Sequence, residues 1–172
     1  MLPRSWIIKP SILEKKRVCA LFFSLFLAGV LGSNTFSFSE ARTQGVVRSV
    51  VDGDTFRLET GERVRLLGIN APEYEPWKNN VEYYGKEAAE YARKILGGKR
   101  VVLERDTEEK DKYGRTLAYV YLESGEFVNL LLVQEGFARA RYYAPNGRYR
   151  KMLGEAQQKA RLSKKGMWAS NV

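Results

Sequence analysis

Asp54, Asn70 and Glu73 place three oxygen-bearing side chains within one short stretch of the chain. Arg65 stands between the first two, and Ala71 offers a main-chain carbonyl beside Asn70. Carboxylate, amide and main-chain oxygens are the ligands of hard cations such as calcium. A cation and an arginine together stabilise the negative charge that develops on a reacting phosphate. The stretch therefore predicts a metal site that serves phosphate chemistry.

The carboxylates of this stretch also have ordinary structural interpretations. Asp52 and Gly53 are typical of a hairpin turn, and for Asp52 we favour that interpretation. Asp54 begins the strand that follows, where aspartate is disfavoured, and this favours a ligand role. Glu73 follows Pro72 and could bind metal, hold a water molecule or act as general base. A solvated loop carboxylate is the alternative for Glu73.

Two arginines are predicted to hold phosphate oxygens. Arg65 interrupts an otherwise apolar strand, where a charge should be paired or functional. Arg115 follows a turn at 111–114 and leads into another strand. Two arginines suit a phosphoryl transition state, because its charge spreads over the equatorial oxygens. A surface ion pair with Asp111 or Asp106 is the alternative for Arg115.

Charge and aromatic residues favour a nucleic-acid partner. The chain carries 29 Lys and Arg against 20 Asp and Glu, a net charge of +9. A small basic domain favours a polyanion. Tyr113, Tyr142 and Tyr143 are candidates for stacking on a base, with a place in the barrel core as the alternative.

Missing residue types exclude several kinds of chemistry. The chain has no histidine, and its one cysteine, Cys19, lies in the N-terminal segment. A mature protein that begins near residue 40 therefore has no Ser-His-Asp or Cys-His catalysis and no zinc site built on Cys and His. Disulfides are excluded as well. Any metal must be held by oxygen, which indicates calcium or magnesium.

The first 41 residues are predicted to be a signal peptide or an N-terminal membrane anchor. Basic residues precede an apolar run over 18–32. This run is shorter than the roughly 20 residues of a membrane span and suits a secretory signal. Small residues at 37–41 suit cleavage, although the preferred Ala-x-Ala is missing. We expect a secreted, periplasmic or cell-envelope protein, with one domain over 42–172.

The mature chain is predicted to form a small β-barrel with about three helices. Strands are expected over 45–51, 55–59, 64–69, 100–105 and 116–122, and helices over 85–96, 128–134 and 148–165. Loops are expected over 70–80, 106–114 and 142–146. Five short strands, with a helix between the third and fourth, are typical of the OB-fold.

The last expected helix has a recognisable apolar side. Its members are Met152, Leu153, Ala156, Ala160 and Leu162. Trp168, which closes the chain, is expected to pack on the barrel.

Four motifs in order resemble the staphylococcal nuclease (thermonuclease) family. They are Asp-Gly-Asp-Thr at 52–55, Arg-Leu-Leu-Gly-Ile-Asn-Ala-Pro-Glu at 65–73, Asp-Lys-Tyr-Gly-Arg-x-Leu-Ala-Tyr at 111–119 and Met-Trp at 167–168. The similarity extends from about 46 to 168, nearly the whole predicted domain. It implies an OB-fold, calcium-dependent endonuclease that cleaves DNA and RNA and leaves 3′-phosphate ends.

Matched position by position, the resemblance also implies roles for individual residues. These are calcium binding by Asp54, Asn70 and Ala71, water activation by Glu73, phosphate binding by Arg65 and Arg115, and a nucleotide pocket at Tyr113 and Tyr143.

Three positions depart from the family pattern. Asn70 stands where the family has a second aspartate ligand, so calcium should bind more weakly or through more water. Ala71 replaces a threonine that offers only its main-chain oxygen, and this change should matter little. Arg141 stands at a pocket position that is normally tyrosine, which affects the expected base preference.

The sequence therefore predicts a monomeric endonuclease whose partners are its DNA and RNA substrates, with no obligate protein partner. The alternative is a non-catalytic OB-fold module that binds nucleic acid. Such modules usually lack the arginine pair or the glutamate, and this chain keeps Arg65, Arg115 and Glu73. A third interpretation is an envelope protein whose basic face holds an anionic polymer.

Overall fold

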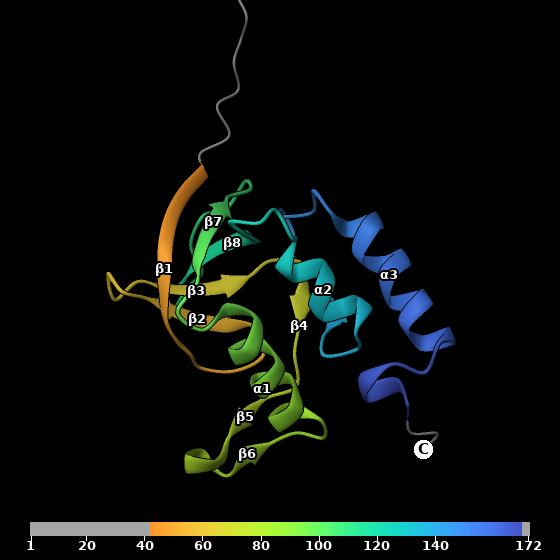
Figure 1. Ribbon diagram of the computed structural model, residues 1–172. Coiled ribbons are helices and arrows are strands. Elements are labelled where there is room, and N and C mark those ends of the chain that lie inside the picture. The colour runs from red at the N-terminus through yellow and green to blue at the C-terminus, as the bar shows by residue number, and fades with distance from the viewer. Residues whose placement is uncertain (1–41, 170–172) are drawn as a thin grey trace, which may run out of the picture. The chain divides into compact units, whose positions relative to one another are not determined.

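Five strands close into a barrel, as the sequence predicts. A computed structural model describes residues 42–169. The strands are β1 (Arg42–Val50), β2 (Thr55–Leu58), β3 (Arg63–Leu66), β8 (Thr116–Leu122) and β7 (Arg100–Glu104), joined in that order around the barrel (Figure 1). The pairings are antiparallel except for β3 with β8. The expected signal or anchor lies outside the described residues, and so does Cys19.

Side chains at alternate positions of the strands form the core of the barrel. In β2 and β3, Phe56, Leu58, Val64 and Leu66 are buried. Residues at alternate positions of a strand point to the same face, so these side chains line the inside of the barrel. The β2–β3 register sets Thr55 opposite Arg65. The hairpin turn thereby brings the carboxylate of Asp54, which precedes Thr55, next to the guanidinium of Arg65.

The third strand is shorter than predicted, and this correction moves a site residue. The expected strand over 64–69 ends at Leu66, and Gly68 adopts a positive φ of +73°. A left-handed conformation is readily available only to glycine, and it turns the chain out of the barrel. The next strand, β4 (Ile69–Asn70), pairs with β9 (Arg139–Ala140). Asn70 therefore leaves the barrel and lies opposite Arg139.

The three predicted helices are present. They are α1 (Gly85–Leu96), α2 (Val128–Gln134) and α3 (Arg150–Leu162). The first two match their predicted bounds, whereas α3 is shorter at both ends than the expected 148–165. Figure 1 shows α2 and α3 packed together on the side of the barrel away from β1.

The predicted apolar side of α3 is partly wrong. Leu153, Ala156 and Ala160 are buried, as expected. Met152 and Leu162 are 44% and 86% exposed. The surface of α3 that packs against α2 is a narrow stripe that contains the small alanines, and these two side chains lie outside it. The C-terminal turn η2 (Gly166–Trp168) follows.

The segment 70–80 is not the plain loop that was predicted. It contains β5 (Tyr74–Glu75), the single turn η1 (Pro76–Lys78) and β6 (Asn80–Val81), which form a small hairpin. A strand of two residues is too short to show an alternation of apolar and polar side chains, so periodicity in the sequence does not predict this hairpin. Within 42–169, no helix is long and apolar enough to cross a membrane.

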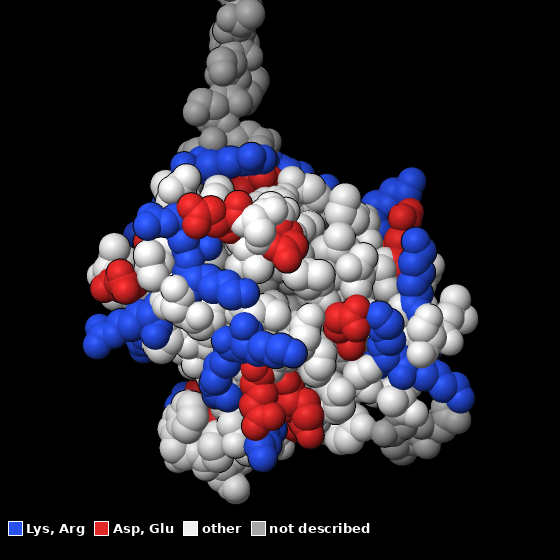
Figure 2. Space-filling model, in the orientation of Figure 1, with Lys and Arg blue, Asp and Glu red and all other residues white. Residues whose placement is uncertain are grey.

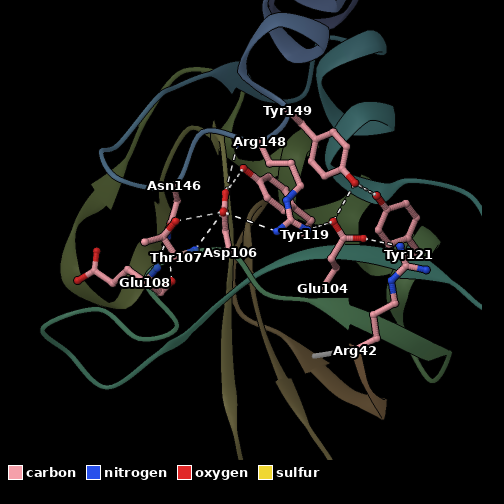
Figure 3. A network of polar contacts seen from close by, with 10 residues as sticks. All are labelled: Arg42, Glu104, Asp106, Thr107, Glu108, Tyr119, Tyr121, Asn146, Arg148 and Tyr149. Atoms are coloured by element: carbon pink, nitrogen blue, oxygen red, sulfur yellow. Dashed lines mark hydrogen bonds and ion pairs between the residues drawn. The ribbon is translucent and has the colours of Figure 1, made fainter. Parts of the chain in front are cut away.

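A buried polar network anchors the loops that follow β7 and precede α3 (Figure 3). Glu104, fully buried at the end of β7, accepts hydrogen bonds from Arg148 and the Tyr149 hydroxyl, and Arg42 pairs with its other oxygen. Asp106 accepts from the Tyr119 hydroxyl and from the Arg148 amide. Two loops that are distant in sequence are thereby held to the same wall of the barrel.

Candidate active site

One cavity collects most of the predicted site residues. It has a volume of about 600 Å³ and is bordered by segments from β3, β4, the loop after β7 and the loop before α3. The predicted residues on its wall are Arg65, Asn70, Glu73, Tyr113, Arg115 and Tyr143. Asp54 and Ala71 are buried. Both connect to the cavity wall through Arg65 and Asn70.

Asp54 lies at the base of this site with both carboxylate oxygens engaged. Its Oδ2 accepts from the Ala71 amide at 2.7 Å and pairs with Arg65 Nη1 at 2.8 Å. Its Oδ1 accepts from the Thr55 hydroxyl. Asp52 accepts a hydrogen bond from the Asp54 amide, the turn role that we favoured for it.

Asn70 joins the same group of residues. Its Oδ1 accepts from Arg65 Nη2 at 3.0 Å, and its Nδ2 donates to the Ala71 carbonyl at 3.3 Å. Asp54 and Asn70 therefore both contact the Arg65 guanidinium, and Ala71 is hydrogen-bonded to each of them, so that oxygens of carboxylate, amide and main-chain type lie close together. This donor set fits a hard cation. Among residues 42–169, no three Asp, Glu, His or Cys side chains group into a metal site, so neutral oxygens must complete any coordination.

The local electrostatics also suit a cation. Burial raises the pKa of Asp54 to about 7, Arg65 opposes this rise, and the Asp52 carboxylate adds to it. Burial likewise raises the pKa of Glu73, with further contributions from Asp52 and Glu75. Around Glu73 the repulsion from Asp52 and Glu75 outweighs the attraction of Arg65, whereas at Asp54 the attraction of Arg65 is larger than the repulsion from Asp52. A bound cation would relieve this repulsion and favour the ionised forms.

The main chain of Glu73 is held from two sides. Its amide donates to the Glu82 side chain, and its carbonyl accepts from the Glu82 amide at 2.9 Å. Gly85 begins α1 directly against it, so that a Cβ at Gly85 would lie 2.2 Å from the Glu73 carbonyl oxygen. The side chain itself is half-buried and borders the cavity. Glu73 can therefore hold a water molecule beside a ligand in the cavity.

The two arginines differ in how much of the guanidinium is free. Arg65 is only 13% exposed and also donates to the carbonyls of Leu66 and Ile69. Arg115 makes the ion pair with Asp111 that we named as its alternative, at 2.7 Å from Nε. That pair uses the Nε edge, and within residues 42–169 the terminal nitrogens of Arg115 make no hydrogen bond or ion pair. A bound phosphate can contact these nitrogens while the ion pair holds the arginine in place.

The predicted tyrosines are exposed and lie beside cations. Tyr113 is 68% exposed, with Lys112 Nζ at 5.1 Å and Arg115 Cζ at 5.6 Å from its ring centroid. Tyr143 is 50% exposed, with Arg141 Cζ at 5.6 Å. Neither belongs to the core, which was the alternative. Exposed rings beside positive charge are suited to stack on bases of a polyanion.

Sequence reasoning did not single out Lys112 or Asn146, which also border the cavity. Lys112 stands inside the motif at 111–119, and that position was a signal available in the sequence. Asn146 is 3% exposed, accepts from the Glu108 amide at 2.8 Å and donates to the Glu108 carbonyl at 2.9 Å. It ties the loop that carries Tyr113 and Arg115 to the loop of Tyr143. Nothing local in the sequence indicates this contact.

Basic side chains are spread over the surface. Figure 2 shows lysines and arginines in several groups on the face drawn, with acidic residues between them. The distribution suits an extended anionic ligand rather than one small anion.

Comparison with known proteins gives consistent matches. The family model described as staphylococcal nuclease homologue matches residues 63–170. A thermonuclease of Staphylococcus intermedius is 42% identical over 143 residues, covering 80% of this chain and 84% of that protein. A thermonuclease of Staphylococcus hyicus is 38% identical, covering 83% and 85%. The endonuclease YncB of Bacillus subtilis (strain 168) is 34% identical over 70% of this chain and 59% of that protein.

Proposed function

The chain belongs to the family of staphylococcal nuclease homologues, and from this premise we propose that it is a calcium-dependent endonuclease that hydrolyses DNA and RNA and leaves 3′-phosphate ends. The relatives named thermonuclease and endonuclease support the hydrolase activity itself. Hydrolysis assays with defined metals and substrates test the metal, the substrates and the position of the cut.

One observation carries the proposal. Arg65, Glu73 and Arg115 come from three separate segments and border the same cavity. Two cations can stabilise the charge on the phosphate and a carboxylate can activate water, so together they suit hydrolysis of a phosphodiester by a chain without histidine.

The proposed roles follow from the surroundings of each residue. Glu73 accepts a proton from a water molecule and orients it for attack in line with the leaving 5′-oxygen. Burial, followed by the Asp52 and Glu75 carboxylates, raises the pKa of Glu73, which makes its carboxylate a stronger base. Arg115 donates its terminal N–H groups to the equatorial oxygens of the phosphate, where negative charge increases in the transition state. Arg65 adds positive charge from the base of the cavity.

Calcium would be held by Asp54, Asn70 and the Ala71 carbonyl, and when bound it supplies a positive charge that polarises the phosphate. Asp54 is the one negatively charged member of this set. A bound cation would join Arg65 in holding the buried Asp54 carboxylate in its ionised form. Because Asn70 is neutral, we expect a weaker calcium site than one with two aspartates.

The exposed tyrosines bind the substrate strand. Tyr113 and Tyr143 border the cavity at its rim, where bases of a single or locally opened strand can stack. A base in a closed duplex keeps its faces covered, so we expect single-stranded DNA and RNA to be preferred.

The rival function is a non-catalytic module that binds nucleic acid on the same fold. It explains the basic surface and the tyrosines equally well. It gives no role to Glu73, whose carboxylate would repel a bound phosphate unless a water molecule or a cation lies between them. The named relatives favour the enzyme.

The test is hydrolysis of heat-denatured DNA and of RNA by the full-length chain. Three reactions contain calcium, magnesium or a chelator, and the product ends are identified with a phosphatase specific for 3′-phosphates. We expect cleavage with calcium alone and 3′-phosphate ends. Tight binding without cleavage in every reaction would overturn the nuclease and leave the binding module. Cleavage in chelator would exclude the metal.

We also propose export to the cell exterior or envelope, directed by residues 1–41, with the domain over 42–172 acting as a monomer. The basic segment followed by an apolar run supports export. Fractionation of expressing cells and N-terminal sequencing of the product test it. Full-length protein in the cytosolic fraction would refute export.

A further inference from the structure

A second, strongly cationic groove lies beside the candidate active site. Arg139 of β9, Arg141 directly after it and Arg161 of α3 line a cavity of about 420 Å³. No acidic residue is among its lining residues. Within 42–169, none of these three arginines makes an ion pair with a carboxylate. Three like charges repel one another, and a bound anion would relieve the repulsion.

Aromatic rings hold the guanidinium groups in place. Arg161 Cζ lies 4.3 Å and Arg139 Cζ 5.7 Å from the ring of Trp168. Arg141 Cζ lies 5.6 Å from the ring centroid of Tyr143. A guanidinium is attracted to an aromatic ring at such a distance without using its N–H groups as donors to an oxygen, so they can still donate hydrogen bonds to an anion. Trp168, which we expected on the barrel, therefore orients two arginines of the groove.

The groove offers donors and little competition for them. Gln157 on its wall uses its side-chain carbonyl to accept from the Ala140 amide at 2.9 Å. This acceptor on the wall of the groove thus already has one donor. Planar guanidinium groups without acceptors nearby are typical binders of phosphate oxygens.

The groove is continuous with the candidate active site. Asn70 and Tyr143 line both cavities, and β4 pairs Asn70 with Arg139. An anion in the groove would therefore be a close neighbour of a phosphate between Arg65 and Arg115. In a nucleic-acid strand, the next phosphate along the backbone satisfies this condition, whereas a mononucleotide ester offers no such group.

We propose that Arg139, Arg141 and Arg161 form a subsite for a second backbone phosphate of the substrate strand, next to the one that is cleaved. This inference rests on the proposed nuclease function. It makes the enzyme selective for oligonucleotides over substrates with a single phosphodiester. Arg141 contributes to strand binding at this subsite.

The test compares the variant R139Q/R161Q with the control R57Q/K94Q in the full-length chain. Both remove two positive charges, and the control residues are exposed on β2 and α1. Binding of a fluorescent oligothymidylate is measured by anisotropy in chelator at several salt concentrations. Loss of one phosphate contact should lower the slope of log affinity against log salt by about 0.7, which is roughly fivefold in affinity at 0.1 M salt. The control should retain the wild-type slope.

Kinetics separate the subsite from the catalytic site. With oligothymidylate, R139Q/R161Q should raise KM about fivefold with little change in kcat. With the p-nitrophenyl diester of thymidine 5′-phosphate, which has one phosphodiester, both constants should match the wild type. Equal losses on both substrates, or no difference from R57Q/K94Q, would overturn the subsite. Inorganic phosphate is the third probe, and competition at low millimolar concentration would assign the groove to a free anion instead.

Two outcomes keep the proposals apart. Normal cleavage by R139Q/R161Q with an unchanged salt slope would refute the subsite and leave the nuclease. Oligothymidylate binding that depends on the groove, without cleavage in calcium, would refute the nuclease and retain the subsite. If the double variant does not fold, Arg139→Gln alone is used, because Arg161 makes the closer contact with Trp168.

Discussion

Replacing Glu104 with glutamine removes one negative charge from the fully buried centre of the network in Figure 3. Glu104 Oε1 accepts from Arg148 at 2.9 Å and from the Tyr149 hydroxyl at 2.8 Å, and Oε2 pairs with Arg42 at 2.8 Å. A glutamine keeps one acceptor oxygen for the first two partners. Its NH₂ group would face the Arg42 guanidinium, donor against donor.

The expected loss in the free energy of unfolding is the sum of two unequal contributions. The Arg148 side chain is about two-thirds buried, and its bond to a neutral glutamine oxygen would contribute about 0.5–1.5 kcal/mol instead of the roughly 1.5–3 kcal/mol of a charge-assisted bond, a loss of about 1–1.5 kcal/mol. Arg42 is 56% exposed on its side of the pair, so that pair contributes about 0.2–1 kcal/mol. We therefore expect E104Q to lower the free energy of unfolding by about 1–2.5 kcal/mol.

Urea unfolding followed by tryptophan fluorescence measures this difference, with Arg42→Gln as the matched control. R42Q removes the exposed partner and should cost about 0.2–1 kcal/mol. Agreement between the two variants within about 0.5 kcal/mol would refute the reasoning. It would mean that desolvation of the buried carboxylate cancels what its hydrogen bonds contribute.

Three further predictions concern the site. Arg115→Ala should lower kcat on heat-denatured DNA about 10³-fold, because it removes donors to the transition-state phosphate; activity within a few-fold of wild type would exclude that role. Asn70→Asp should lower the calcium concentration for half-maximal activity by about tenfold through the added ligand charge, and an unchanged calcium titration would place Asn70 outside the metal site. Burial raises the pKa of Asp111, but hydrogen bonds from Arg115 and the Tyr113 amide together outweigh burial and hold it below its usual 3.8. Asp111→Asn should therefore destabilise the protein at neutral pH, and urea unfolding from pH 7 to pH 2 should show the difference shrinking as pH falls below about 4, whereas a difference independent of pH would contradict this account.

Local sequence patterns predicted those helices and strands whose apolar residues recur at a regular spacing or whose ends are marked by glycine or a change of composition. The helices at 85–96 and 128–134 have their predicted bounds because glycines or a change of composition mark their ends. The barrel follows from alternation in short strands joined by tight turns. The break at Gly68 was missed, because a left-handed glycine inside an apolar run looks like strand sequence. The hairpin over 74–81 was missed because its strands are too short to show a period.

The sequence by itself determined which residue types are available for chemistry. Without histidine, and with Cys19 outside the predicted domain, only carboxylates, amides, arginines and tyrosines remain, and their motifs named the candidate residues. The tertiary structure decided which of them meet. Pairing of β4 with β9 sets Asn70 beside Arg139, and Asn146 joins the loops of Arg115 and Tyr143. These contacts link residues far apart in the chain, and the arginine groove exists only through them, since no local sequence preference encodes a distant neighbour.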